Sequence, residues 1–285
     1  MTLLNDVVEC IKRTKKKQAP NKLAILHSEE NPLIYKSVLL GVEIEAENPE
    51  TLNIEQKEIW YQVGDGSLKI NGKEFIFRRP VASKDIFYCL KLIEPNLKNA
   101  LFNIRTGFHV HTDVTRLESL KILSIILHSY LCESLLFQFK QERYASPFCT
   151  PITDMLSIDN FFNLLKLDHG AIFVNTKYIS INVRTISTKG SIEYRLFPAT
   201  NNINDYIDYI NAVLCIRKYA TNKKTLTELK KGYLIGDGNL YDIVNIFKYC
   251  PKIYKFMKEK ALTDNNLKLN YIYIRLTLDR LLKGE

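Results

Sequence analysis

The most informative stretch of the chain is Gly107-Phe108-His109-Val110-His111-Thr112-Asp113. It is rich in aromatic and β-branched residues, which favour an extended strand. Side chains two positions apart on a strand point to the same face of its sheet, so His109 and His111 are expected to lie together. Two adjacent imidazoles on an otherwise apolar strand serve no evident packing purpose. We therefore expect this strand to carry part of a functional site.

Other short stretches repeat this spacing with different polar groups. In each, two polar side chains are separated by one hydrophobic or aromatic residue. The pairs are Glu43 and Glu45, Asn182 and Arg184, and Glu193 and Arg195. A further expected strand, residues 72–80, adds Glu74. Buried carboxylates at adjacent positions repel one another, so a sheet that gathers them needs a cation or basic partners. The alternative for Glu43 and Glu45 is an exposed edge strand whose acidic face lies in water.

The composition is that of an ordinary globular protein, with 285 residues of which 46% are hydrophobic and 25% charged. The length allows one large domain or two small ones. The formal net charge is +9, and the one dense basic run, residues 12–17, is interpreted as a solvated helix end in preference to a nucleic-acid or membrane patch. The positive charge and the 16 tyrosines keep a nucleic-acid binder as an alternative. The tyrosines are dispersed and no recognition motif accompanies them, which disfavours it.

The six cysteines are isolated from one another and lack the paired spacing of a zinc site. They suit free thiols in a reducing cytoplasm. No apolar run approaches the roughly 20 residues that span a bilayer, and the N-terminus lacks the apolar core of a signal peptide. We therefore expect a cytoplasmic protein with no membrane partner. The bias toward Ile, Asn, Lys and Tyr is compatible with a low-GC bacterium or a virus-infected host cell.

The spacing of apolar residues predicts an α+β fold with strands, flanking helices and a helical C-terminal region. The expected strands are 34–47, 72–80, 107–113, 171–174, 178–186 and 191–197. The expected helices are 2–18, 84–100, 115–140, 158–167, 203–220, 224–231, 239–248, 251–260 and 266–283. The chain is divided into a docking helix and linker (1–30), a catalytic domain (31–221) and a helical extension (222–285). The extension would suit a protein partner or a homo-oligomer.

On one face, these strands would supply four carboxylates, two imidazoles and at least two arginines. Carboxylate-rich sites with few nitrogen ligands suit Mg²⁺ or Mn²⁺ better than zinc, and Mg²⁺ typically bridges to substrate phosphates. Arg184 and Arg195, expected beside the metal, match the fixed cations that a transferring phosphoryl group requires. The set describes a nucleotide-phosphate site. It does so without the usual GxxxxGK[ST] or GxGxxG cradle, and no Ser-His-Asp or Cys-His order suggests acyl-enzyme chemistry.

The order of these motifs resembles the amidoligases, a family of carboxylate-amine ligases in the superfamily of glutamine synthetase and glutamate-cysteine ligase. The family pattern runs Gly-x-Glu-x-Glu, Trp followed by Asp-Gly-Ser-Leu, Gly-x-Glu before a proline, Gly-x-His-x-His-x-Asp, Arg before a proline-containing loop, and Thr or Ser-x-Glu-x-Arg. This chain has all of these motifs in that order, over residues 40–213. The resemblance implies the curved, mainly antiparallel sheet of the glutamine synthetase catalytic type.

The resemblance also implies roles for the matching residues. The metal ligands would be Glu43, Glu45, Glu74, His109 and Glu193. The contacts to the phosphates of ATP, or to an acyl-phosphate intermediate, would be His111, Arg184 and Arg195. Asp65 and Ser67 would lie toward the acceptor amine, with Ser67 also near the cofactor, and Arg143 would meet a substrate carboxylate. Catalysis would fall to Arg184, Arg195 and Asp65. The implied cofactors are ATP and Mg²⁺ or Mn²⁺, and the implied reaction joins a small-molecule or peptide carboxylate to an amine through an amide or isopeptide bond.

Two departures from the pattern bear on the acceptor pocket. The Asp-Gly-Ser element follows Glu-x-Glu here, whereas it precedes it in glutamine synthetases. Phe77-Arg78-Arg79-Pro80 replaces the small residues often found before that proline. The alternative function is that of an inactive protein with this fold, serving as a binding or structural component of a larger assembly. The identity of the carboxylate and the amine and the oligomeric state stay open.

Overall fold

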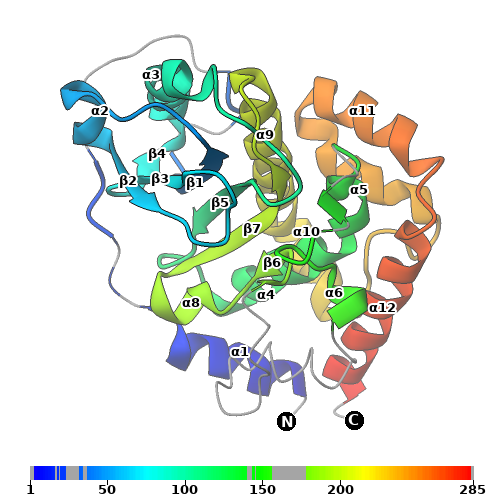
Figure 1. Ribbon diagram of the computed structural model, residues 1–285. Coiled ribbons are helices and arrows are strands. Elements are labelled where there is room, and N and C mark those ends of the chain that lie inside the picture. The colour runs from blue at the N-terminus through cyan, green and yellow to red at the C-terminus, as the bar shows by residue number, and fades with distance from the viewer. Residues whose placement is uncertain are drawn as a thin grey trace.

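Strand β1, Leu39–Glu47, forms the middle of an antiparallel sheet and is paired along both edges. Its neighbours are β3, Gly72–Phe77, on one side and β5, Gly107–Asp113, on the other. The seven-stranded sheet has the order β2-β3-β1-β5-β7-β6, and β4 also pairs with β1. The remaining strands are β2 (Trp60–Gly64), β4 (Val81–Ala82), β6 (Ile181–Asn182) and β7 (Ser191–Pro198). The expected α+β class with a mainly antiparallel sheet is therefore confirmed (Figure 1).

This computed structural model describes most of the chain. The described residues are 3–16, 18, 20–23, 32–34, 37–139, 143–144, 146–155 and 178–283. The expected helix over 158–167 and the expected strand over 171–174 lie outside these residues.

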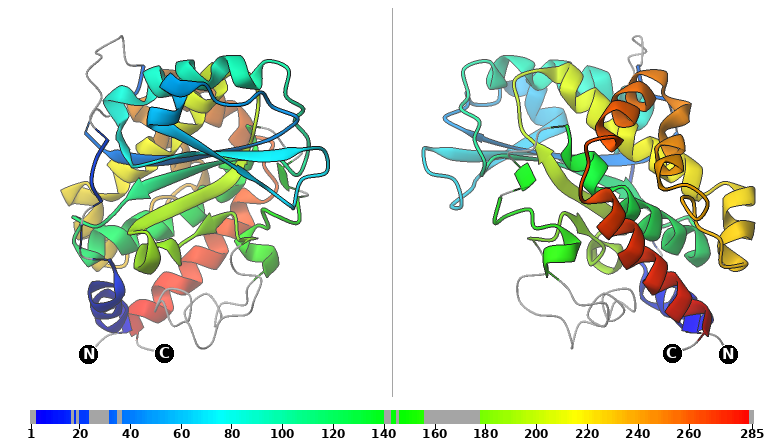
Figure 2. Two further views of the ribbon diagram at one scale, coloured as in Figure 1. Left: turned by 60° about the vertical axis from the view of Figure 1, so that its left-hand side comes forward. Right: turned by 90° about the vertical axis from the view of Figure 1, so that its right-hand side faces the viewer.

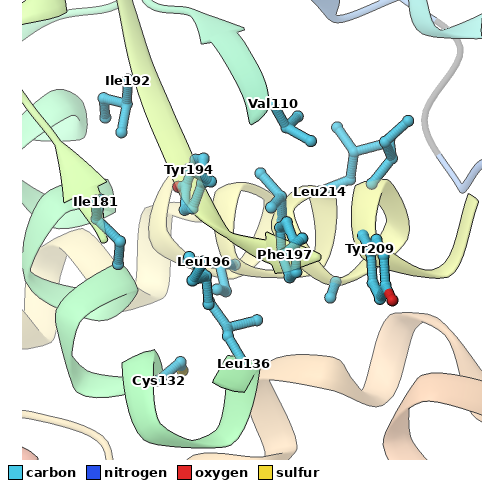
Figure 3. Close-up of a cluster of buried hydrophobic side chains, with 14 of the residues drawn as sticks. Val110, Cys132, Leu136, Ile181, Ile192, Tyr194, Leu196, Phe197, Tyr209 and Leu214 are labelled. Carbon is cyan, nitrogen blue, oxygen red and sulfur yellow. The ribbon is translucent and has the colours of Figure 1, made fainter. Parts of the chain in front are cut away.

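One face of the sheet is apolar. Val42 lies opposite Val110 and Val110 lies opposite Tyr194, and all three side chains are buried. Figure 3 shows Val110 and Tyr194 within this hydrophobic cluster. Because side chains alternate along a strand, the residues between them point to the opposite face. The sheet therefore separates a hydrophobic core from a second face that carries the polar residues.

Two long helices cover the apolar face (Figure 2). Helix α9, Ile203–Ala220, places Tyr206 against Phe108 of β5, with ring centroids 4.3 Å apart. Helix α4, Ser119–Leu131, approaches β7, and its Ser129 hydroxyl lies 2.7 Å from the Tyr194 hydroxyl. Helix α3 (Ile86–Leu97) packs beside α9. The two buried hydroxyls thus satisfy one another inside the core, and the helices hold the sheet from behind.

The C-terminal helices and the N-terminal helix extend the same core. They are α10 (Lys223–Lys230), the 3₁₀ helix η4 (Leu240–Tyr249), α11 (Pro251–Ala261), α12 (Leu267–Lys283) and α1 (Leu3–Thr14). Phe247, Ile274 and Leu278 from these helices are buried in the continuous hydrophobic cluster. Helix α1 packs on α4 and α12, which suits its expected role as a docking helix. The domain boundaries stay a prediction.

Several expected elements differ in extent. The single helix expected over 115–140 is divided at Cys132 into α4 and α5, Glu133–Phe137. The strand expected over 178–186 is limited to β6, because the chain turns into the short helix α8 (Thr185–Thr188) directly afterwards. The short helices α2 (Ile54–Ile59) and α6 (Ile152–Met155) were not expected, and the helix expected over 84–100 begins with the 3₁₀ turn η1 (Ser83–Asp85). Helix α2 has a signal in the sequence, since Asn53 and Gln56 form a capping box.

The ladder between β3, β4 and β1 is interrupted. Ile76 pairs with Glu43, and Val81 pairs with Leu40. The segment from Ile76 to Val81 is therefore longer than the segment of β1 that lies opposite it. Residues 78–80 therefore loop out of the sheet. This is the Arg-Arg-Pro segment that departs from the amidoligase pattern.

A second irregularity lies in β7. Val110 and Phe108 of β5 lie opposite Tyr194 and Phe197, so β7 contains one extra residue at this point. Such a β-bulge changes the alternation of faces along a strand. Phe197 is thereby returned to the core, where Figure 3 shows it beside Tyr209 of α9. Arg195 precedes the shift and shares the polar face with Glu193.

The cysteines and the helices of the described residues bear on the class of protein. All six cysteines are thiols, as expected. Within the described ranges, the helices are too short or too polar to cross a bilayer.

A buried carboxyl group links three elements behind the sheet. Glu133 of α5 accepts hydrogen bonds from the backbone N–H of Ile152, at 3.1 and 3.2 Å, and from the Ser180 hydroxyl. Burial raises the pKa of Glu133 to about 8, although these hydrogen bonds partly oppose the rise. Glu133 therefore holds a proton at neutral pH in the folded protein.

We predict that Glu133→Gln makes stability less dependent on pH. Between the ordinary pKa of 4.5 and about 8, the folded protein keeps a proton that the unfolded chain has released. Raising the pH through this window therefore lowers the free energy of unfolding, by up to about 1.4 kcal/mol per pH unit. Urea unfolding at pH 5, 6.5 and 8 should show a smaller loss for Glu133→Gln than for wild type. The exposed Glu94→Gln is the control, and equal slopes in all three proteins would contradict the prediction.

Candidate active site

The polar face gathers side chains from four neighbouring strands. Strand pairing places Glu45 of β1 opposite Glu74 of β3. It places Glu43 opposite His109 of β5, and His111 opposite Glu193 of β7. Directly opposed residues have Cβ atoms about 4.5–5.5 Å apart, so these groups are forced into contact. Segments that are distant in sequence therefore form one cluster of carboxylates and imidazoles.

His109 lies at the centre of this cluster and is 1% exposed. Its Nδ1 atom is 3.1 Å from Glu43 Oε2 and 3.8 Å from Glu193 Oε1. Its Nε2 atom lies 3.5 Å from Glu45 Oε1 and, within the described part of the chain, has no hydrogen-bond partner. Two sets of possible metal ligands include His109. Within each set, the ligand atoms lie within 4.8 Å of one another. The sets are Glu43, His109 and Glu193, and Glu45, Glu74 and His109.

The two sets fit divalent cations by their donor atoms. Carboxylate oxygens with a single nitrogen suit Mg²⁺ or Mn²⁺ better than zinc. A neutral imidazole offers one lone pair and one N–H, so His109 can serve as a ligand to only one of the two sets at a time. If Nδ1 is the ligand, Glu43 and Glu193 complete the set and Nε2–H points to Glu45. The crowding of carboxylates around His109 is the observation that favours a cation here.

The charges of the cluster are partly compensated within the protein. Burial alone would raise the pKa of Glu43, but the imidazoles of His111 and His109 hold it well below its usual range. Burial likewise opposes ionisation of Glu193, yet Arg195, His111 and His109 lower its pKa. Both carboxylates are therefore ionised at neutral pH and available as metal ligands.

Glu74 behaves in the opposite way. Burial, together with the neighbouring charges of Glu43 and Glu45, raises the pKa of Glu74 to about 8. The negative charge of Asp65 adds to this rise, which places Asp65 within electrostatic reach of Glu74. An ionised Glu74 would add a third negative charge beside Glu43 and Glu45, and this is disfavoured unless a cation is bound there. Cation binding is expected to displace the Glu74 proton.

Two arginines flank the carboxylates. The Nη1 atom of Arg195 donates to Glu193 Oε1 at 2.6 Å. Arg143 is 1% exposed, donates through Nη1 to the Ile104 carbonyl at 2.9 Å, and lies with Nη2 at 3.9 Å from Glu45 Oε2. Among the described residues, Arg143 Nη2 and Arg195 Nε have no hydrogen-bond partner. These buried N–H groups are available to an anionic ligand.

His111 and Lys189 meet the other side of Glu43. The His111 Nε2 atom is 3.1 Å from Glu43 Oε1, and Lys189 Nζ is 3.0 Å from the same oxygen. Strand spacing did not single out Lys189, because it lies in the turn before β7 where alternation gives no information. The spacing of polar residues predicts Asn182 only as half of a pair with Arg184, but the Asn182 amide donates to Glu193 Oε2 at 2.8 Å and so orients this carboxylate.

The remaining expected site residues lie in a turn and at the start of a short helix, next to strands that carry the cluster. Asp65 and Ser67 occupy the turn between β2 and β3, where Asp65 Oδ1 accepts the Ser67 N–H at 2.8 Å. Arg105 donates to the Ser67 carbonyl at 2.7 Å and fastens this turn. Arg184 directly precedes α8, and its backbone N–H donates to Asn182 Oδ1 at 3.0 Å. The roles of Asp65, Ser67 and Arg184 stay predictions.

A cavity of about 210 Å³ opens beside Glu43 and His111. Its walls combine apolar side chains, among them Ile76 and Phe77, with the cations Lys189, Arg78 and Arg79. The looped-out 78–80 segment contributes two of these cations. The cavity thus lies beside the carboxylate cluster and has cationic and apolar walls. This combination suits a phosphorylated ligand.

We predict that Glu43→Gln weakens the binding of Mn²⁺ in the absence of nucleotide. The substitution removes a charged ligand, so its effect should be at least the roughly 10- to 100-fold that loss of an outer partner costs at metal sites. Glu47→Gln is a matched control, because Glu47 is buried on the same strand but accepts the backbone N–H of Lys69. Mn²⁺ titrations followed by electron paramagnetic resonance measure both. Equal affinities in the two variants would contradict the metal assignment.

A second prediction concerns Gly107, where the backbone closely approaches the site. A Cβ atom there would lie 2.3 Å from Arg143 Nη2 and 2.8 Å from His109 Nε2. Since Arg143 is buried, Gly107→Ala should lower the free energy of unfolding by about 1–3 kcal/mol and impair Mn²⁺ binding. Gly66→Ala is the control, because a Cβ atom there meets no described atom within 4 Å. Thermal unfolding with and without Mn²⁺ checks both variants, and identical behaviour would refute the close approach.

Comparisons with models of protein families, with curated proteins and with solved structures found no match. The resemblance to amidoligases therefore rests on the motifs in the sequence. The functional inference rests on the geometry of the cluster and its cavity.

Proposed function

We propose that this protein is an ATP-dependent carboxylate-amine ligase of the amidoligase kind, with its active site on the polar face of a glutamine synthetase-like sheet. The supporting observation is the arrangement around His109. Carboxylates from β1, β3 and β7 form two donor sets that share this imidazole. Each set contains residues that the motif resemblance names as metal ligands.

The proposed metals are Mg²⁺ or Mn²⁺. Glu43, His109 and Glu193 would hold one ion, and Glu45 and Glu74 would hold a second. Bound there, the ions would neutralise phosphate charge and polarise the phosphoryl oxygens. The cavity beside Glu43 would receive the triphosphate of ATP, with Lys189 and Arg78 on its wall.

The remaining residues would act on the reacting groups. A substrate carboxylate oxygen attacks the γ-phosphorus, the bond to the β-phosphate oxygen breaks, and ADP leaves. Arg195 would stabilise the charge that shifts to the leaving oxygens, and Arg184 and His111 would hold the phosphates. Arg143, with its uncompensated Nη2 atom, would hold the carboxylate substrate before and during the attack.

The second half of the reaction forms the amide bond. The amine nitrogen attacks the carbonyl carbon of the acyl phosphate, and inorganic phosphate leaves with the bonding electron pair. Asp65 would accept the proton that the amine loses, because it is the carboxylate on the turn beside Glu74. Ser67, on the same turn, would help to position the amine. The products are an amide or isopeptide, ADP and phosphate.

We predict that Arg195→Ala lowers the rate of ADP release by about 10²–10³, the usual cost of removing a preorganised charge stabiliser. The assay supplies Mg-ATP with pooled carboxylates and pooled amines and measures ADP. Arg275→Ala is a control, because Arg275 forms its ion pairs with Asp237 and Asp279 in the C-terminal region, away from the sheet.

Two outcomes would count against the proposal. If Arg195→Ala releases ADP as fast as wild type, the role of Arg195 is wrong. If the wild-type protein releases no ADP with any pool and Mg-ATP does not raise its stability by the roughly 2.7 kcal/mol expected of a ligand at about 100 times its Kd, the alternative of an inactive binding or structural protein is supported instead.

A further inference from the structure

Lys189 occupies an unusual position at the mouth of the active site. Its ammonium group lies 3.0 Å from Glu43 Oε1, yet its side chain is 55% exposed. Glu43 and Glu193, by contrast, are buried. Lys189 is thus a partly solvated cation that is paired with a buried carboxylate.

The backbone around Lys189 is held in place. The N–H groups of Lys189 and Gly190 both donate to the Thr185 carbonyl at 2.8 Å. Gly190 has a φ of +76°, and a Cβ atom there would lie 2.5 Å from Thr115, so the turn has one accessible shape. The long Lys189 side chain therefore changes its contacts by rotating its own bonds while the turn stays fixed.

The pairing of Lys189 competes with the proposed metal. Glu43 is a member of the donor set with His109 and Glu193. An ammonium group and a divalent cation repel one another, and at a few ångströms this repulsion is substantial even near a protein surface. A metal ion held by Glu43 therefore displaces the Lys189 ammonium group.

The displaced ammonium group has a defined destination. Lys189 lines the same cavity as Arg78 and Arg79. Arg78 is tied through Nε to the Lys57 carbonyl, and this backbone contact leaves its charge unneutralised. A phosphate chain in the cavity would meet all three cations. Lysine is well suited to this task because its charge is compact and its stem is flexible.

We propose that Lys189 is an exchangeable counter-ion, which pairs with Glu43 before metal binds and turns to the phosphates of the nucleotide once metal has taken Glu43. This inference rests on the proposed function. It makes Lys189 a nucleotide-contacting residue that the motif resemblance does not name. It also has a distinctive consequence, since Lys189 opposes the binding of metal alone and favours the binding of metal with nucleotide.

The test measures both ligands with Lys189→Met, which keeps the length of the side chain and removes its charge. In nucleotide-free protein at low ionic strength, Mn²⁺ followed by electron paramagnetic resonance should bind about three- to tenfold more tightly than to wild type. The non-hydrolysable β,γ-methylene analogue of ATP, with Mg²⁺ and followed by calorimetry, should bind roughly tenfold more weakly. Lys189→Arg keeps the charge and should bind Mn²⁺ as wild type does.

Lys252→Met is the matched control. Lys252 forms a similar exposed ion pair, at 2.6 Å from Asp208, but on α11, and its loss should change neither affinity. If Lys189→Met binds Mn²⁺ as wild type does or more weakly, or binds the analogue as tightly, the exchange is refuted. If the wild-type protein binds no Mn²⁺, the metal centre, the ligase proposal and the Lys189 exchange are all refuted. If both affinities shift as expected while no substrate pool gives ADP release, Lys189 exchange is supported and the ligase activity is refuted.

Discussion

Repulsion between buried carboxylates is the constraint on which this structure depends. The pairing of β1 with β3 and β5 brings the buried Glu43 and Glu45 together with the half-buried Glu74 on one face of the sheet. Like charges in such a setting are tolerated only with protons or cations among them. The protein uses both, since Glu74 takes up a proton and Glu193 pairs with Arg195. Gathering like charges in this way lowers the stability of the fold, which is why we attribute the arrangement to function.

The sheet separates this costly face from the part of the molecule that stabilises it. Behind the strands, apolar side chains and the stacked rings of Phe108 and Tyr206 join the sheet to α9. Stacked aromatic pairs contribute about 0.5–1.5 kcal/mol beyond the area that they bury. The C-terminal helices add to the same continuous core. Such a support can hold the carboxylates in a fixed geometry, and preorganised charges of this kind are what phosphoryl transfer requires.

Alternation along single strands could be predicted from the sequence, and the pairing of strands could not. The period of two placed His109 beside His111 and Glu193 beside Arg195 on one face, and both placements agree with the structure. Which strands become neighbours depends on the tertiary fold, for which the order of motifs in a known family was the available guide. Lys189 was missed because it lies in a turn, where no period applies. The short extent of β6 was missed because the helical turn after it carries the same β-branched residues as a strand.

The extra residue in β7 makes the length of this strand as important as its composition. If alternation continued regularly from Tyr194 at the present length, Phe197 would face the carboxylates and its ring would leave Tyr209. With the bulge, Glu193 and Arg195 lie on the polar face while the Phe197 ring still packs on Tyr209 in the core. If the ladder became regular without a change in length, Phe197 and the residue after it would exchange inside and outside. Natural variation in this segment should therefore preserve the bulge more strictly than the identity of its residues.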